Sequence, residues 1–179
     1  MLVVLDADVI VPILTCDLLL TAAEAGLIQP IWSATILDEV RRNLIAIHPE
    51  IEPARLERRV QLMVDAFPDA LVEGWEQQTE SVPVNPKDRH VLGVAKLARA
   101  ERIVTNDSKL RTQLERADEI PGISLDEFAI NGLAEDPEGW RTVVATLVTK
   151  RRNPPIDRDQ FLTALAIHVP GFITNPKLG

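Results

Sequence analysis

Four acidic residues occupy positions from which carboxylates could act together. Asp6 ends an apolar run that reads as a strand, and Asp107 follows a second such run. Glu39 borders the apolar face of one predicted helix, and Asp88 lies in the first turn of another. The carboxyl ends of parallel strands and the helices that follow them share one edge of a sheet. We therefore expect the four side chains to converge there.

The chemistry of such a cluster points to a metal ion. Carboxylates held close together repel one another and resist ionisation unless a cation joins them. The three histidines are scattered at 48, 90 and 168, so a zinc site is not indicated. An all-oxygen site suits Mg²⁺ or Mn²⁺, which clamp phosphates, lower the pKa of a bound water and support phosphodiester hydrolysis.

Each acid also has an ordinary structural explanation when taken alone. Asp88 is favoured in a first helical turn by the helix dipole, and Glu39 fits a solvated helix surface. Asp107 fits a turn or a helix cap, and Asp8 a cap of the next helix. Asp6, directly ending an apolar strand, is harder to explain in this way. The set in this order is more specific than any member.

Alternating strands and helices must position these residues. Short strands are predicted at Leu2–Leu5, Ile28–Trp32, Leu71–Val72, Arg102–Thr105 and Ile123. Helices are predicted at Val9–Ala25 (with Pro12 in the first turn), Ala34–Ile47, Ala54–Phe67, Lys109–Ala117, Leu125–Ala134, Trp140–Lys150 and Asp159–Ile167. The pattern indicates an α/β three-layer fold with a mostly parallel sheet, over residues 1–134, and a helical C-terminal appendage, over 135–179.

The stretch 85–108 contains the most informative helix and strand. Asn85 is suited to cap a helix whose first position is Pro86. The face from Asp88 through Val91 and Leu92 then follows helical spacing and is apolar apart from its leading carboxylate. A carboxylate thus begins a buried helix face, and another follows a strand shortly afterwards.

Composition limits the classes of function. The chain has 179 residues, 46% of them hydrophobic, and a formal net charge of −8, which argues against a general electrostatic grip on nucleic acid. The lone Cys16 excludes an internal disulfide. The sequence shows no signal peptide and no apolar run long enough to span a membrane, so a cytoplasmic location is expected.

Three segments resemble the PIN-domain nucleases. LDADVIV is similar to the first-acid strand of that family, SATILDEVRRNL to its second-acid helix, and NPKDRHVLGVAKLARAERIVTNDSKL to the segment with its third and fourth acids. The match covers about residues 1–130, and the whole chain looks like a longer branch of the VapC-type toxin ribonucleases. The resemblance implies a PIN α/β/α sandwich, a Mg²⁺- or Mn²⁺-dependent endoribonuclease, a VapB-type antitoxin partner and a homodimer.

Residue roles follow from this resemblance. Asp6, Asp88 and Asp107 would hold the metal, and Glu39 would complete the site or orient the attacking water. Asp8 replaces the Asn or Ser that is common in the family and adds a carboxylate, while Thr105 and Asn106 fit as polar supporters. Candidate contacts to RNA phosphates flank the acids, at Arg41, Arg42, Lys87, Arg89, Lys109 and Arg111.

Two other functions remain open at this point. Asp6-Ala7-Asp8 at a strand end is also compatible with a haloacid-dehalogenase-type phosphatase, although Ile10 replaces the Thr or Val expected there. A catalytically degenerate PIN module that binds RNA or a protein is the non-enzymatic alternative. The intact set of four acids argues against it, because loss of metal ligands is the simplest sign of degeneration.

Overall fold

The sheet of the computed structural model, which describes residues 1–78, 84–150 and 157–179, has four parallel strands. They are β1 (Leu2–Leu5), β2 (Gln29–Ile31), β3 (Arg102–Val104) and β4 (Gly122–Ile123). Their order is β2-β1-β3-β4, and Val4 of β1 pairs with Ile31 on one side and Ile103 on the other. Because β1 and β3 are neighbours, the residues that follow them are brought together.

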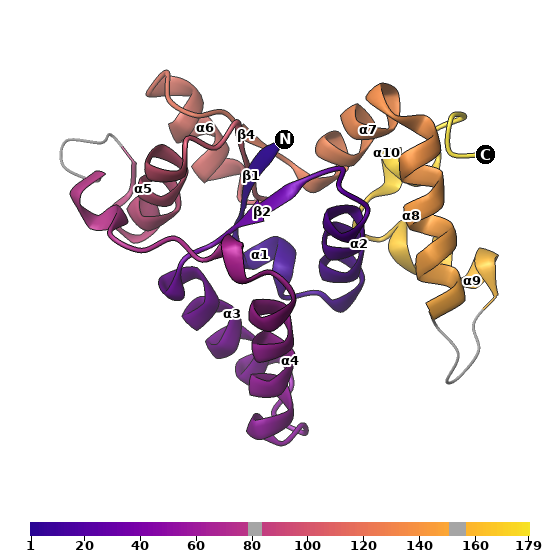
Figure 1. Cartoon of the computed structure of the whole chain (residues 1–179), viewed down its shortest axis with the longest axis horizontal. Helices are drawn as coiled ribbons and strands as arrows, with labels where there is room; N and C mark the ends of the chain where they lie inside the picture. Colours follow the sequence, from indigo (N-terminus) through magenta and orange to yellow (C-terminus); the bar gives the residue numbers. More distant parts are fainter. Residues whose placement is uncertain (79–83, 151–156) are drawn as a thin grey trace.

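Helices cover both faces of this sheet and make the fold three-layered, as predicted. They are α1 (Ala7–Ile10), α2 (Ile13–Glu24), α3 (Ala34–Ile47), α4 (Pro53–Ala66), α5 (Arg89–Ala98), α6 (Ser108–Arg116), α7 (Leu125–Glu135), α8 (Pro137–Lys150), α9 (Arg158–Leu165) and α10 (Pro170–Ile173). Short 3-10 turns are η1 (Pro68–Ala70), η2 (Trp75–Gln78) and η3 (Pro86–Asp88). Figure 1 shows α5 on one side of the sheet and α2, α7 and α8 on the other.

The strands are buried because both faces are covered. Val3, Val4 and Leu5 are all 0% exposed, as expected for a parallel strand with a continuous apolar sequence. Helix α5 packs against β1 and β3 through the apolar face that begins after Asp88. The predicted helix and strand of residues 85–108 are confirmed, with Asn85 capping η3 immediately before α5.

Pro12 divides the first predicted helix. The expectation of one helix over Val9–Ala25 was wrong, because α1 ends at Ile10 and α2 begins at Ile13. Pro12 is extended, with ψ near 131°, and has no N–H to continue the ladder of helical hydrogen bonds. The short helix α1 is therefore a separate turn, and it carries Asp8.

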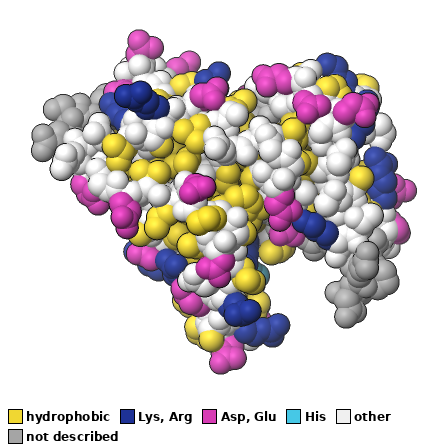
Figure 2. All heavy atoms as spheres, viewed as in Figure 1, with side chains coloured by type: hydrophobic (Ala, Val, Ile, Leu, Met, Phe, Trp, Pro, Cys, Tyr) yellow, Lys and Arg dark blue, Asp and Glu magenta, His cyan; other side chains and the backbone are white. Residues whose placement is uncertain are grey.

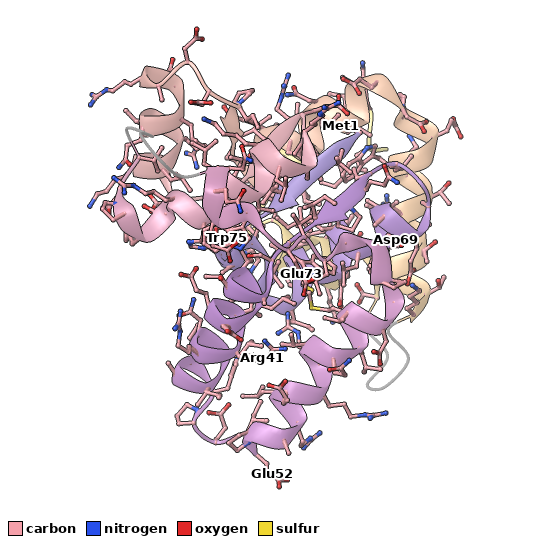
Figure 3. All side chains as sticks on the ribbon, turned by 60° about the vertical axis from the view of Figure 1, so that its left-hand side comes forward. Met1, Arg41, Glu52, Asp69, Glu73 and Trp75 are labelled. Carbon is pink, nitrogen blue, oxygen red and sulfur yellow. The ribbon has the colours of Figure 1, made fainter. Side chains whose placement is uncertain are left out.

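Helices α3 and α4 form an arm that extends away from the sheet (Figure 1). Ser33 caps α3 by accepting a hydrogen bond from the Ile36 amide. Arg41 reaches from α3 to Glu57 of α4 at 3.0 Å (Figure 3). Figure 2 shows charged side chains at the tip of this arm and hydrophobic ones over the middle of the same face. After the arm, the predicted strand at Leu71–Val72 is reduced to one bridge, between Leu71 and Trp32.

The C-terminal helices pack on the rest of the chain. Helix α8 lies against α2 and α7, and α10, which the sequence did not predict, lies against α7. Asp126 of α7 accepts hydrogen bonds from the amides of Gly171 and Phe172, at 3.0 and 2.8 Å. One hydrophobic cluster includes residues on both sides of position 134. A domain boundary there stays a prediction.

Among the described helices, none is both long and apolar enough to cross a membrane. The basic run that starts at Lys150 lies mostly outside the described residues. Lys150 itself pairs with Glu24 at 2.6 Å.

Candidate active site

Two acids follow β1 at the edge of the sheet. Asp6 caps α1, and its Oδ1 accepts a hydrogen bond from the Ala7 amide at 2.7 Å. Asp8 lies in the first turn of the same helix. Its Oδ2 accepts a hydrogen bond from the Asn106 amide at 2.9 Å, whereas its Oδ1 is buried and has no hydrogen-bond partner among the described residues. Asp8 Oδ1 is thus a buried acceptor that lacks a donor among the described residues.

Thr105 connects these acids to the end of β3. Its hydroxyl, which is completely buried, donates to Asp6 Oδ2 at 2.8 Å and more weakly to Asp8 Oδ2 at 3.3 Å. The same oxygen accepts a hydrogen bond from the Asp107 amide at 3.1 Å. Thr105 therefore lies between three of the acids. Asn106 holds Asp8 through its backbone, and its side chain accepts from the Leu125 amide at 3.1 Å.

Burial makes the two acids after β1 hard to ionise. Desolvation raises the pKa of Asp6, although the Thr105 hydroxyl opposes this shift. Desolvation, followed by the nearby charge of Asp6, raises the pKa of Asp8 from its ordinary value of 3.8 to about 6. A cation between these carboxylates would lower both pKa values, because it favours the charged form of each group.

Asp88 and Asp107 lie on the rim of the same edge, with Lys87 between them. The Lys87 Nζ is 3.3 Å from Asp88 Oδ1 and 3.8 Å from Asp107 Oδ2. Asp107 also caps α6 by accepting hydrogen bonds from the amides of Lys109 and Leu110. Partial burial raises the pKa of Asp107, but these amides and the Lys87 charge outweigh that effect and leave the pKa below its ordinary value.

Glu39 reaches the site through a histidine. Its Oε2 is 3.5 Å from Nε2 of His90, which is 6% exposed and makes an edge-on ring contact with Trp75. His90 in turn interacts electrostatically with Asp6. His90 was not among the site residues predicted from the sequence. No helical periodicity marks it, and its position two residues after Asp88 was the only signal.

The six basic residues predicted to contact RNA differ in the hydrogen bonds and ion pairs that already engage their side chains. Arg111 donates to the Thr105 carbonyl at 2.8 Å, and Arg89 to the Val84 carbonyl at 3.3 Å. Arg41 is paired with Asp38 and Glu57. The remaining basic residues are Lys87, described above, Arg42, which is exposed and 3.8 Å from Glu39, and Lys109, which is exposed.

The carboxylate oxygens at this edge of the sheet are the type of ligand that a hard divalent cation prefers. The unpartnered Asp8 Oδ1 and the raised pKa values of Asp6 and Asp8 both indicate a shortage of positive charge. As the side chains lie, however, no group of three or more His, Cys, Asp or Glu residues among the described ones is close enough to hold an ion.

Comparison with known proteins supports the fold that carries these residues. The sequence profile of the PIN domain matches residues 2–109, a range that contains Asp6, Glu39, Asp88 and Asp107. No curated protein and no solved structure matches the chain. PIN domains are generally nucleases, so the match favours this class over the phosphatase alternative. Because the profile covers more than half of the 179 residues, the chain belongs to the PIN-domain family.

Proposed function

We propose that the protein is a metal-dependent endoribonuclease that acts in the cytoplasm as the toxin of a type II toxin–antitoxin pair. The observation that carries the enzymatic part is the pair Asp6, which is buried, and Asp8, which is partly buried; the Thr105 hydroxyl contacts both carboxylates and accepts from the Asp107 amide. One oxygen of Asp8 has no partner among the described residues. A protein that used this edge only for packing would gain nothing from carboxylates in such an environment.

The acids would hold Mg²⁺ or Mn²⁺, with Asp6, Asp88 and Asp107 as ligands and Asp8 as an additional one. When bound, such an ion clamps a phosphate and lowers the pKa of a coordinated water. Thr105 keeps the Asp6 carboxylate in one orientation through its 2.8 Å hydrogen bond. Glu39, whose Oε2 lies 3.5 Å from His90 Nε2, would orient the attacking water.

RNA phosphates would be bound by cations on the rim. Arg42 and Lys109 are exposed and flank the acids, which makes them the strongest candidates. Lys87 would join them once it leaves the two rim carboxylates. The buried contacts of Arg89 and Arg111 favour a supporting role, because each holds a backbone carbonyl of the site.

The partner is proposed to be a VapB-type antitoxin, whose tail would block the acidic edge, and the toxin is proposed to form a homodimer. Support for both comes from the resemblance of LDADVIV and the later segments to VapC-type toxins. The role of residues 135–179 in such a complex is open to direct test by co-purification with an antitoxin.

Mn²⁺ binding by calorimetry is the decisive experiment, with structured RNA cleavage measured in parallel. We expect wild type to bind Mn²⁺ and cut RNA, and the double variant Asp6→Asn/Asp88→Asn to lose both. Asp38→Asn is a suitable control, because Asp38 is an exposed acid of α3 that pairs with Arg41 on the same helix. Wild-type protein that binds Mn²⁺ but cleaves no RNA would refute the ribonuclease proposal.

A degenerate PIN module that binds RNA or protein is the second candidate. It is favoured by the observation that the described acids do not already form a group able to hold a metal. Absence of Mn²⁺ binding by wild type, together with RNA binding that survives in the double variant, would support this candidate.

A further inference from the structure

Helix α1 is a single turn whose carboxyl end needs partners from elsewhere. A helix this short leaves its last carbonyls without intrahelical donors, and Pro12 beyond it has no N–H to offer. The Thr15 hydroxyl satisfies the Val9 carbonyl at 2.7 Å. The next two carbonyls, of Ile10 and Val11, depend on a residue far away in the chain.

That residue is Arg59 of α4. Its Nη2 donates to the Ile10 carbonyl at 2.8 Å, and its Nη1 donates to the Val11 carbonyl at 3.0 Å. The planar guanidinium suits two neighbouring acceptors, and its positive charge suits the negative end of a helix dipole. Arg59 thus forms a two-point link from the α3–α4 arm to the helix that carries Asp8.

The other end of α1 is anchored at the active site. Asp6 caps the helix while it accepts from Thr105, and Asp8 accepts from the Asn106 amide. One turn of helix has no stability of its own, because nucleation costs more than a single hydrogen bond returns. Its position therefore depends on what holds its two ends.

We propose that Arg59 is a positioning residue of the active site, which keeps Asp6 and Asp8 in place by capping the carboxyl end of α1. Loss of the guanidinium would leave two carbonyls without partners, and α1 would shift to reach water. The hydrogen bond from the Asn106 amide to Asp8 would then lengthen. The expected effect on metal binding rests on the proposed function, whereas the effect on the position of α1 does not.

Amide hydrogen exchange tests the position of α1 without a metal. In Arg59→Met, we expect the amides of Val11 and Asn106 to exchange about tenfold faster than in wild type. The Ile103 amide, which donates to the Pro121 carbonyl in the core sheet, serves as the internal reference and should not change. Arg58→Met is the matched control, because Arg58 is an exposed neighbour on the same helix.

Mn²⁺ calorimetry, well below the melting temperature, gives the functional readout. We expect Arg59→Met to bind Mn²⁺ about tenfold more weakly, as for loss of an outer partner of metal ligands. Arg59→Lys should recover part of the affinity, because an ammonium can reach one carbonyl but not both. It also provides a folded variant if Arg59→Met does not fold.

Three outcomes would overturn the proposal. One is wild-type exchange at Val11 and Asn106 in both Arg59 variants. Another is equal acceleration at Ile103, which would mean ordinary destabilisation of the whole fold. The third is an unchanged Mn²⁺ affinity in Arg59→Met. If wild type binds no Mn²⁺, the proposed enzymatic function fails, but the exchange rates still decide the role of Arg59.

Discussion

Asp6, which is buried, and Asp8, which is partly buried, form a pair after β1 that we call the buried pair, whereas Asp88 and Asp107 form a rim pair closer to solvent. The buried pair is held by neutral donors, the Thr105 hydroxyl and backbone amides, and within the described part of the chain it forms no salt bridge. The rim pair has Lys87 between its members, and Asp107 also caps α6. Burial raises the pKa of both members of the buried pair, while the pKa of Asp107 is lowered.

This difference indicates that the two pairs of acids would respond differently to a bound cation. The buried pair is positioned in advance but lacks a counter-charge, so it gains most from a bound cation. The rim pair has its own counter-charge, which a bound cation must replace. The following predictions test this contrast, in order of decreasing effect.

The largest effect is expected from Asp8→Asn. Asparagine keeps an acceptor for the Asn106 amide but loses the charge of the buried pair, so we expect Mn²⁺ affinity and RNA cleavage to fall by about 100-fold or more. Calorimetry and cleavage kinetics measure the two quantities. Asp118→Asn is the control, because Asp118 is exposed and its left-handed backbone accommodates Asn. Full activity in Asp8→Asn would mean that the rim pair alone carries the site.

The same variant should change the pH dependence of stability in metal-free protein. The Asp8 pKa is raised in the fold, to about 6 from 3.8, so the native state keeps the proton longer than the unfolded state. Wild-type stability should therefore fall as the pH rises from about 4 to 6, by on the order of 2 kcal/mol. Asp8→Asn should lack this part of the decline. Urea unfolding in EDTA at about pH 4 and pH 6 measures it, and an equal change of stability in Asp8→Asn at the two pH values would contradict the prediction.

Thr105→Val should affect both pairs. The variant keeps the shape but removes the hydroxyl that donates to Asp6 and accepts from the Asp107 amide. We expect Mn²⁺ affinity and cleavage to fall by about 10- to 100-fold, and stability by roughly 1–3 kcal/mol for the groups left unpaired. Thr105→Ser should restore most of both. If valine is tolerated, the hydroxyl does not join the two pairs.

Lys87→Met should tighten metal binding. A metal ion no longer has to displace an ammonium from Asp88 and Asp107, so we expect Mn²⁺ affinity to rise about fivefold, equivalent to roughly 1 kcal/mol for an exposed ion pair. The KM for RNA should rise at the same time, because a phosphate contact is lost. Lys109→Met is the control for general charge. Equal effects of the two lysines on Mn²⁺ affinity would show that Lys87 has no special position.

A variant distant from both pairs should leave the site unchanged. Asp157 caps α9 through the Gln160 amide at 2.8 Å. Asp157→Ala should lower stability by about 1 kcal/mol without altering Mn²⁺ affinity. Thermal unfolding and calorimetry give the two values. A weaker Mn²⁺ affinity would instead couple the C-terminal helices to the active site.

Several parts of this molecule were readable from local sequence. The apolar run before Asp6 and the β-branched run before Asp107 both mark strands that lie beside each other in the sheet. The cap Asn85 marks the start of a helical turn, since its side chain accepts a hydrogen bond from the free Lys87 amide. Such signals depend on residues a few positions apart, and the chain itself keeps those residues close.

Other features were decided only by the tertiary structure. The sequence predicted that Asp6, Asp8, Asp88 and Asp107 belong to one site. The surroundings of each side chain, such as the Lys87 ammonium beside Asp88 and Asp107, were set only by folding. Arg59 lies 48 residues from Val11, and Glu39 and His90 meet between different helices. No periodicity marks such pairs, because burial and long-range contacts set their energies and exist only after the layers have packed.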